Sequence, residues 1–193
     1  MTVQNETATV QNGVNVEALL GAREAMEETP ELGLFTWRAR AKWAGGIHTQ
    51  IEVDGFYGLN EEQTRGRVHK IDSDHPEHFA AADKGATPVE IVLAALAGCL
   101  GAGVASVAQH RGIQLRSVEA RVEGDMDMAG IMGIDPAVRN GFSAIRIDFQ
   151  IDADATGDEI AALVAQSQKR SAVFDIITNP TNVHATVTKV GAA

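Results

Sequence analysis

The sequence contains a single cysteine among its 193 residues, and this scarcity limits the chemistry that the chain can perform. One thiol cannot form a disulfide within the chain. The N-terminal stretch MTVQNETATVQNG also lacks the basic and apolar segments of a secretory signal peptide. We therefore expect a protein of the reducing cytoplasm, and we expect no membrane-spanning segment.

Basic residues are also few, with 16 Lys and Arg against 26 Asp and Glu and a formal net charge of −10. A surface of this sign repels the phosphates of nucleic acids, so we expect no nucleic-acid partner. The sequence has neither a Gly-x-Gly-x-x-Gly motif near a strand–helix turn nor a Walker A motif. Because these motifs bind the phosphates of nucleotides, we expect no nucleotide cofactor.

The six histidines do not suggest a metal site. His75 and His78 lie three residues apart in DHPEHF, with Asp74 and Glu77 beside them. Zinc needs about four ligands in a tetrahedral arrangement. Since the only cysteine belongs to a different element, we predict a solvated loop here and no bound metal.

Hydrophobic patterning predicts a short N-terminal part and one domain. Residues 1–13 are expected to form a disordered tail, 14–33 a helical segment and 34–193 a single domain. Alternation predicts a β-hairpin over 35–55, with Trp37 and Trp43 in the core. A loop-rich stretch over 56–86 follows, with one short strand near Arg67–Ile71. Strands are predicted over 115–127, 142–152 and 182–190, and a helix over 156–170. This order indicates an α+β fold with antiparallel sheet.

A long helix is predicted to begin in the stretch GATPVEIVLAALAGCLGAG. Thr87 and Glu90 have the spacing of a capping box, and Arg111-Gly112 ends the helix. No charged residue lies between Glu90 and Arg111, so we expect the helix to be buried nearly all round, at the domain centre or at a subunit interface. Small residues line one side and suit close contact between helices, namely Ala94, Gly98, Ala102 and Ala105.

Cys99 lies in the middle of this helix, and its residue type allows two interpretations. Free cysteine often packs as a small buried hydrophobe. A reactive thiol needs a nearby cation, a helix N-terminus or a metal ion to favour its thiolate form. The sequence does not show which group would do this, so both interpretations stay open at this point.

Several motifs in a fixed order resemble the OsmC/Ohr family of osmotically inducible and organic-hydroperoxide-resistance proteins. They are TPVEIVLAALAGC, WAGG, RGIQLRSVEARVEGDMD, RNGFSAIRIDFQIDADA and QKRSAVFDIITNPTNVHATV, and they span about residues 35–190. The resemblance implies an α+β fold in which curved antiparallel sheets wrap long central helices. It also implies an intertwined homodimer with active sites at the interface. Peroxidases of this family reduce organic hydroperoxides with two cysteines, and an arginine and a glutamate activate the first.

The family's functional positions are only partly matched here. Cys99 occupies the place of the first, peroxidatic cysteine, whereas Ser171 stands where the resolving cysteine belongs. Val89 takes the place of the activating glutamate, with Glu90 one position further on, and His48 takes the place of the arginine. A serine cannot resolve a sulfenic acid. The resemblance therefore implies a divergent single-cysteine branch that depends on an external thiol.

Three functions remain possible from the sequence. The first is a thiol-dependent peroxidase in which Cys99 reduces a small apolar hydroperoxide with an external thiol as reductant. The second is a cysteine-nucleophile enzyme, a hydrolase or transferase acting on a small apolar electrophile, with His48 as partner of the thiol. The third is a non-catalytic homodimer that binds an apolar ligand beside Cys99. We favour the first, with Cys99, His48, Ser171 and Glu90 as candidate catalytic residues and no cofactor.

Overall fold

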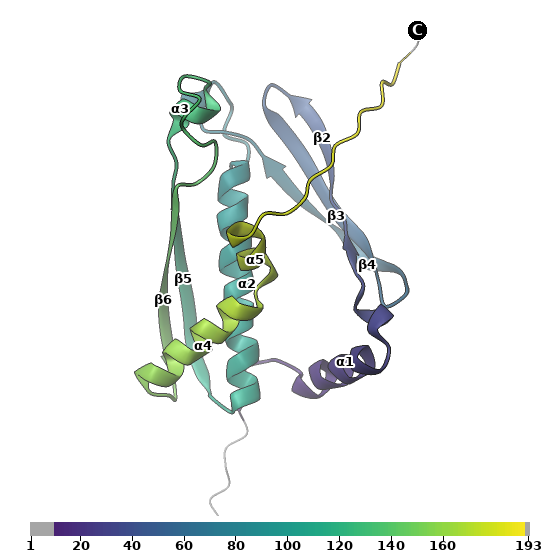
Figure 1. The fold of residues 1–193 in the computed structure, drawn as a ribbon, viewed down its shortest axis with the longest axis vertical. Helices are drawn as coiled ribbons and strands as arrows, with labels where there is room; N and C mark the ends of the chain where they lie inside the picture. The colour runs from purple at the N-terminus through teal and green to yellow at the C-terminus, as the bar shows by residue number, and fades with distance from the viewer. Residues whose placement is uncertain (1–9, 192–193) are drawn as a thin grey trace, which may run out of the picture.

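The computed structural model describes residues 10–191 and has an α+β fold. Its central element is the long helix α2 (Pro88–Arg111). On one side of α2 lies a sheet of β5 (Leu115–Asp125) and β6 (Ala144–Ala153), and a second sheet lies on the other side (Figure 1). The second sheet contains β1 (Thr36–Trp37), β2 (Arg40–Gly45), β3 (His48–Gly58) and β4 (Glu61–Ser73). All pairings between these strands are antiparallel, so the predicted fold class is confirmed.

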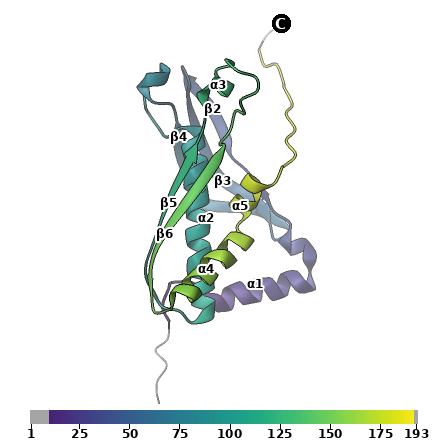
Figure 2. The same ribbon diagram turned by 60° about the vertical axis from the view of Figure 1, so that its left-hand side comes forward.

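Shorter helices surround these elements. They are α1 (Val16–Glu28), η1 (Pro30–Gly33), η2 (Glu77–Phe79), α3 (Met128–Ile131), α4 (Gly157–Arg170) and α5 (Ala172–Thr178). Helices α1 and α4 both lie at the C-terminal end of α2, and α5 continues from α4 along α2 (Figures 1 and 2). The predicted helix over 156–170 corresponds to α4.

The hairpin predicted over 35–55 is present, but the loop-rich stretch predicted over 56–86 is wrong in its first half. Strand β3 continues to Gly58, and β4 follows with 13 residues. The turn between them places Leu59 and Asn60 at φ of 55° and 64°, the left-handed region that two-residue hairpins use. The sequence EEQTRGRVHKIDS has polar residues on both faces, so it lacks the alternation that marks a strand.

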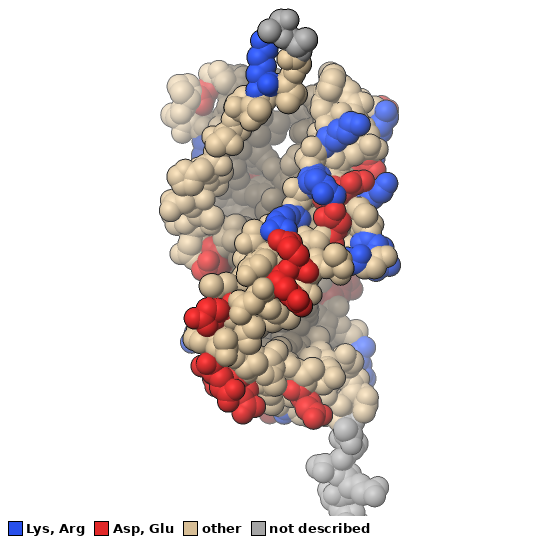
Figure 3. Space-filling model, turned by 90° about the vertical axis from the view of Figure 1, so that its right-hand side faces the viewer, with Lys and Arg blue, Asp and Glu red and all other residues tan. Residues whose placement is uncertain are grey.

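The aromatic residues of the second sheet are not in the core, which corrects the prediction for the tryptophans. Trp37 is 65% exposed and Trp43 is 72% exposed. Trp37 stacks between Phe35 and Phe56, but no helix among the described residues covers this part of the sheet extensively. Figure 3 shows the molecule from the right-hand side of Figure 1. Basic and acidic residues lie next to one another on this face, and its upper part is hollowed between residues that are mostly uncharged.

Helix α2 is buried along one stripe only. Leu96, Leu100, Val104 and Ala108, each four residues from the next, are the buried residues of the helix, and they face α4 and β5. The opposite side exposes Ala94, Gly98 and Ala102. A single chain therefore does not bury α2 all round, which rules out burial at the domain centre alone and leaves the subunit interface as a prediction.

Helix α2 is also long and apolar enough to cross a membrane by length and composition. The sequence therefore holds an uncharged apolar run of this length, and the expectation that it spans no membrane stays a prediction. The core helix of a soluble protein meets the same criterion, and the buried stripe along α2 fits a core helix.

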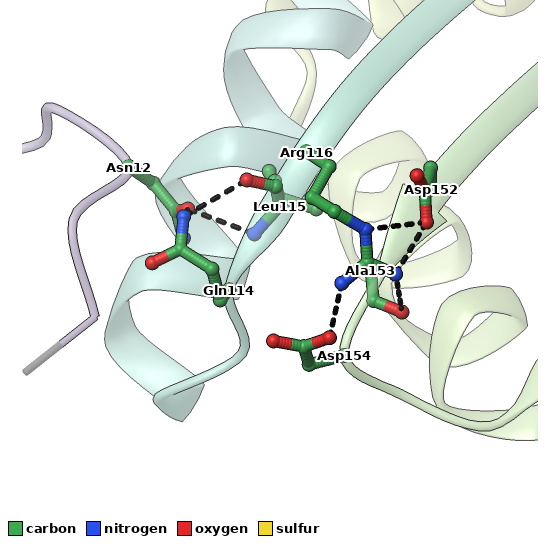
Figure 4. Close-up of polar contacts among 7 residues, drawn as sticks. All are labelled: Asn12, Gln114, Leu115, Arg116, Asp152, Ala153 and Asp154. Carbon is green, nitrogen blue, oxygen red and sulfur yellow. Dashed lines mark hydrogen bonds and ion pairs between the residues drawn. The ribbon is translucent and has the colours of Figure 1, made fainter. Parts of the chain in front are cut away.

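Within the described residues, the N-terminal segment contacts the domain from Gln11 onward. Residues 1–9 lie outside the described part of the chain. The Asn12 side chain donates to the carbonyl of Ile113 at 2.7 Å. It also accepts from the backbone N–H of Leu115 at 2.9 Å (Figure 4). Beyond Leu115, Arg116 binds Asp152 and Asp154 across the sheet. The hydrogen bond from Arg116 lowers the pKa of Asp152.

The C-terminal segment forms no strand, which corrects the prediction of one over 182–190. After α5 the chain continues in an irregular conformation away from α2 (Figure 2). Val183 and Val187 are almost fully exposed, at 86% and 95%. The β-branched residues of this segment favour a strand, but a strand needs a neighbour, and no sheet edge of the same chain pairs with it among the described residues.

Candidate functional site

Cys99 is half-buried on α2 and contacts the junction between two other helices. Its Sγ accepts a hydrogen bond of 3.0 Å from Ser171 Oγ. Ser171 is only 5% exposed and lies between the end of α4 at Arg170 and the start of α5 at Ala172. The fold therefore brings together two residues that are 72 positions apart in the sequence.

The orientation of Ser171 is fixed by local structure. Its Oγ accepts from the backbone N–H of Phe174 at 3.1 Å, which makes Ser171 the N-cap of α5. A serine oxygen has two lone pairs and one proton, so it can accept this bond and donate to sulfur at the same time. Both contacts restrict the same side-chain torsion and hold the hydroxyl against Cys99.

A glycine on α2 allows α4 to come close enough for this contact. A Cβ atom at Gly103 would overlap the hydroxyl of Ser167. Ser167 is buried and donates to the backbone carbonyl of Leu100 at 2.8 Å. Gly103 and Ser167 thus set the spacing between α2 and α4, and Ser171 follows one turn later.

A cavity of about 370 Å³ is lined by residues that are near this pair in the sequence. Its walls come from α2, β6 and α5, and they include Leu96 and Phe174. Leu96 lies about one turn before Cys99, and Phe174 lies about one turn after Ser171. Cys99 and Ser171 are not among its lining residues, whereas Arg139 is, so the cavity begins about one helical turn from the pair and is lined mainly by apolar side chains.

Glu90 lies away from Cys99 and caps α2. The two residues are nine positions apart on the helix, or about 13 Å along its axis. Glu90 Oε2 accepts from the backbone N–H of Thr87 at 2.7 Å and from its hydroxyl at 2.8 Å. These bonds, the backbone one first, lower the pKa of the Glu90 carboxyl. The predicted capping box is confirmed.

We expect Glu90→Ala to lower the melting temperature by a few degrees at pH 7 and by less in acid. A carboxylate whose pKa is lowered on folding stabilises the fold above its ordinary pKa of about 4.3. This stabilisation is lost as the pH falls through the lower pKa of the folded state. Melting curves of both proteins between pH 7 and pH 3 would measure the difference.

Glu24→Ala is the matched control, because it removes an exposed carboxylate from α1 that makes no ion pair among the described residues. Its effect should be small at every pH. If the difference in melting temperature between the native protein and Glu90→Ala stays constant down to pH 3, Glu90 is not a capping carboxylate.

His48 is held by another residue of the same sheet. Its Nε2 lies 2.7 Å from Asp72 Oδ1, and its side chain is 12% exposed. The hydrogen bond with His48 is the main cause that lowers the pKa of Asp72. No hydrogen bond joins His48 to Cys99 in the part of the chain that the structure describes.

Val89 borders a second apolar cavity, of about 600 Å³, at the start of α2. His75 and His78 also line it, together with Met126, Met128 and Met132. The loop is therefore less solvated than predicted. Among the described residues, no group of three or more His, Cys, Asp or Glu side chains could hold a metal ion.

The structure thus joins two of the four candidate site residues and separates the others. Cys99 and Ser171 are in contact, whereas His48 and Glu90 bind Asp72 and Thr87. Sequence reasoning missed Ser167 and its fit against Gly103. Among the glycines near Cys99, Gly103 is approached closely, whereas for Gly98 and Gly101 the space around a Cβ is open.

The chain thus has an α+β fold in which two antiparallel sheets surround a central helix, and this helix carries a half-buried thiol. The sequence model of the OsmC-like protein family matches residues 81–186, more than half of the chain. The chain therefore belongs to the OsmC-like protein family. No match to the chain is found among curated proteins.

Solved structures share this fold at low sequence identity. An organic hydroperoxide resistance protein OsmC from Legionella pneumophila is 21% identical, with a TM-score of 0.53, and the match covers 75% of this chain and 90% of that one. An OsmC-like protein from Mycoplasma pneumoniae is 17% identical, with a TM-score of 0.58 and coverage of 75% and 89%. One from Vibrio cholerae, described as of unknown function, is 12% identical, with a TM-score of 0.55 and coverage of 72% and 92%.

Proposed function

We propose that the protein reduces small organic hydroperoxides through Cys99, with an external thiol as reductant. The observation that carries this proposal is the 3.0 Å hydrogen bond from Ser171 to the Cys99 sulfur. A mainly apolar cavity of about 370 Å³ begins about one helical turn from the two residues. The thiolate form of cysteine is the nucleophile, and the hydrogen bond fixes the position of the Cys99 sulfur. The description of the Legionella structure as an organic hydroperoxide resistance protein supports this choice of substrate.

The reaction begins when the Cys99 thiolate attacks the terminal oxygen of the hydroperoxide. An S–O bond forms as the O–O bond breaks, and the departing alkoxide takes a proton to become an alcohol. Sulfur is oxidised to the sulfenic acid, and the peroxide is reduced by the same two electrons. The apolar wall formed by Leu96 and Phe174 suits the alkyl part of such a substrate.

Ser171 cannot form a disulfide, so the cycle needs thiols from outside the chain. The first external thiol attacks the sulfenic sulfur, releases water and forms a mixed disulfide with Cys99. A second thiol then releases Cys99 as thiolate and leaves as the oxidised disulfide. Half-exposure of Cys99 admits these reductants. The chemistry suits the reducing cytoplasm, where small thiols are abundant, and we place the protein there.

The test is the consumption of cumene hydroperoxide by the intact protein with excess dithiothreitol. We expect a rate well above that of dithiothreitol alone and a lower rate with hydrogen peroxide, which has no apolar part. A rate equal to the background with both peroxides would overturn the proposal. The hydrolase or transferase alternative has no support from the geometry, because His48 binds Asp72 and does not contact the thiol.

We also propose that the working form is a homodimer in which a second copy covers the open side of α2. Ala94, Gly98 and Ala102 form an exposed apolar strip on α2. The strip lies between Glu90 and Arg111, where the helix has no charged residue. The side chains of Trp37 and Trp43 and the exposed valines of the C-terminal segment are likewise uncovered. Exposed apolar surface of this extent is typical of protein interfaces.

Gly98→Leu is expected to convert this dimer into monomers. A side chain at Gly98 meets no atom within 4 Å in the single chain, so the subunit should fold, but the closest approach of two helices would be blocked. Ala161→Leu on α4 is the control, because Ala161 is an exposed helical position outside α2. Sedimentation equilibrium measures the masses. A native protein that is monomeric, or a Gly98→Leu dimer of unchanged strength, would refute the arrangement.

A further inference from the structure

A groove of about 390 Å³ lies between α1, the C-terminal end of α2 and α4. The three helices meet at the lower end of the molecule (Figures 1 and 2). Its walls are formed by Leu19, Leu20, Arg23, Ser106, Val107, His110, Arg111, Gln166 and Arg170. Cys99 is not among them, so this groove is separate from the candidate active site.

The charge of the groove is opposite to that of the protein. The chain has a net charge of −10, yet three arginines and no carboxylate line the groove. Arg23 pairs with Glu27 at 2.8 Å. Neither Arg111 nor Arg170 makes an ion pair within residues 10–191. Two guanidinium groups are therefore available for an anion from outside the chain.

Local contacts hold one of these guanidinium groups at the groove wall. When the oxygen of the Gln166 side-chain amide points toward Arg170, it accepts a hydrogen bond from Arg170 Nε at 2.8 Å. Arg111 and Arg170 lie in the last turns of α2 and α4, where the helix dipole favours cations. The dipole does not account for Arg23, which lies in the interior of α1.

The rest of the lining is apolar. Leu19 and Leu20 are about half exposed on α1 and face Val107 of α2 across the groove. A fully hydrated inorganic ion would gain nothing from these side chains. An alkyl chain, in contrast, would remove apolar surface from water on both sides at about 25 cal/mol per Å².

We propose that this groove binds a small amphiphilic anion, a carboxylate or a phosphate monoester that carries a short alkyl chain. The head group lies between Arg111 and Arg170, and the chain lies against Leu19, Leu20 and Val107. Arginine suits either head group because its planar donors bind carboxylate and phosphate oxygens in pairs. This binding does not depend on the chemistry proposed for Cys99.

Isothermal titration of the full-length protein with four probes tests the proposal. Octanoate and octyl phosphate have both features, octanol lacks the charge and acetate lacks the chain. We expect saturable binding of octanoate, octyl phosphate or both, and binding at least about tenfold weaker for octanol and acetate. Preference for one of the two anions identifies the head group. Octanol that binds as tightly as octanoate, or no binding of either amphiphilic anion, would overturn the proposal.

Variants locate the site. Arg111→Gln and Arg170→Gln should each weaken binding about tenfold, since each removes one charged hydrogen-bond donor group. Lys42→Gln is the matched control, because it makes the same charge change on β2, outside the groove. Cys99→Ser should bind with native affinity, which separates this proposal from the peroxidase proposal. If Arg111→Gln and Lys42→Gln lower the binding affinity equally, the effect is one of overall charge and the proposed site is refuted.

Discussion

Cys99→Ser is expected to lower hydroperoxide consumption to the rate of the external thiol alone. A serine hydroxyl is not ionised near neutral pH and is a far weaker nucleophile than a thiolate, and losing a nucleophile removes most of an enzyme's acceleration. Because Cys99 is the only cysteine, dimedone should label the native protein at a single position after peroxide treatment. The variant should show no label by mass spectrometry.

Ser117→Ala on β5 is the matched control, since Ser117 is an exposed serine far along the chain from the site. It should retain the native rate and the native labelling. A Cys99→Ser protein that keeps more than about a tenth of the native rate would rule out the thiol as nucleophile, whereas a native protein without dimedone adduct would rule out the sulfenic acid.

Ser171→Cys is expected to change the chemistry from one cysteine to two. Ser171 Oγ and Cys99 Sγ are 3.0 Å apart, so a second sulfur at this position needs only a small shift to reach the S–S bond length of about 2.05 Å. One equivalent of hydroperoxide should then consume both thiols and leave an intramolecular disulfide. Dimedone labelling should nearly disappear, because the second thiolate reaches the sulfenic acid first.

Ser106→Cys provides the control for proximity. Ser106 is on the same side of α2 as Cys99, but seven residues separate them, about 10 Å along the axis. That spacing is too long for a disulfide. Its two thiols should stay independent and dimedone labelling should persist. If Ser171→Cys retains full dimedone labelling and two free thiols after peroxide, the contact at the junction of α4 and α5 is not formed in solution.

The sequence predicts the elements whose signals are local. The start of α2 is predicted from Thr87 and Glu90, and its end from Gly112, because a cap involves residues only a few positions apart. Strand β4 could not be predicted at its full length, because its polar residues occupy both faces and its turn uses Leu59 at positive φ. Propensity rules assign such a position to other residue types.

Features that depend on distant contacts were not predicted from local patterns. Apolar residues alternate with polar ones around Trp43 and around Val187, yet a single chain leaves both of these side chains exposed. Alternation shows that a face is apolar, but it does not show which surface covers it. The groove between α1, α2 and α4 was missed for a related reason, since its arginines come from three separate helices.

The candidate site was predicted in part. Resemblance to a family placed Ser171 opposite Cys99, and the contact is present. Resemblance also suggested His48 and Glu90, but their side chains bind nearer partners. Alignment transfers a position along the chain, whereas hydrogen bonding depends on which neighbour at that position is closest in space.

The bare backbone at Gly103 makes the geometry at the sulfur sensitive to a mutation that touches neither reacting group. Even one methyl group there would force α4 outward, because it would meet the Ser167 hydroxyl. Ser171 follows Ser167 at the end of α4. An outward shift of α4 would therefore lengthen the distance between Ser171 Oγ and Cys99 Sγ. A substitution of Gly103 is therefore expected to alter the contact between Ser171 and Cys99 without changing either residue.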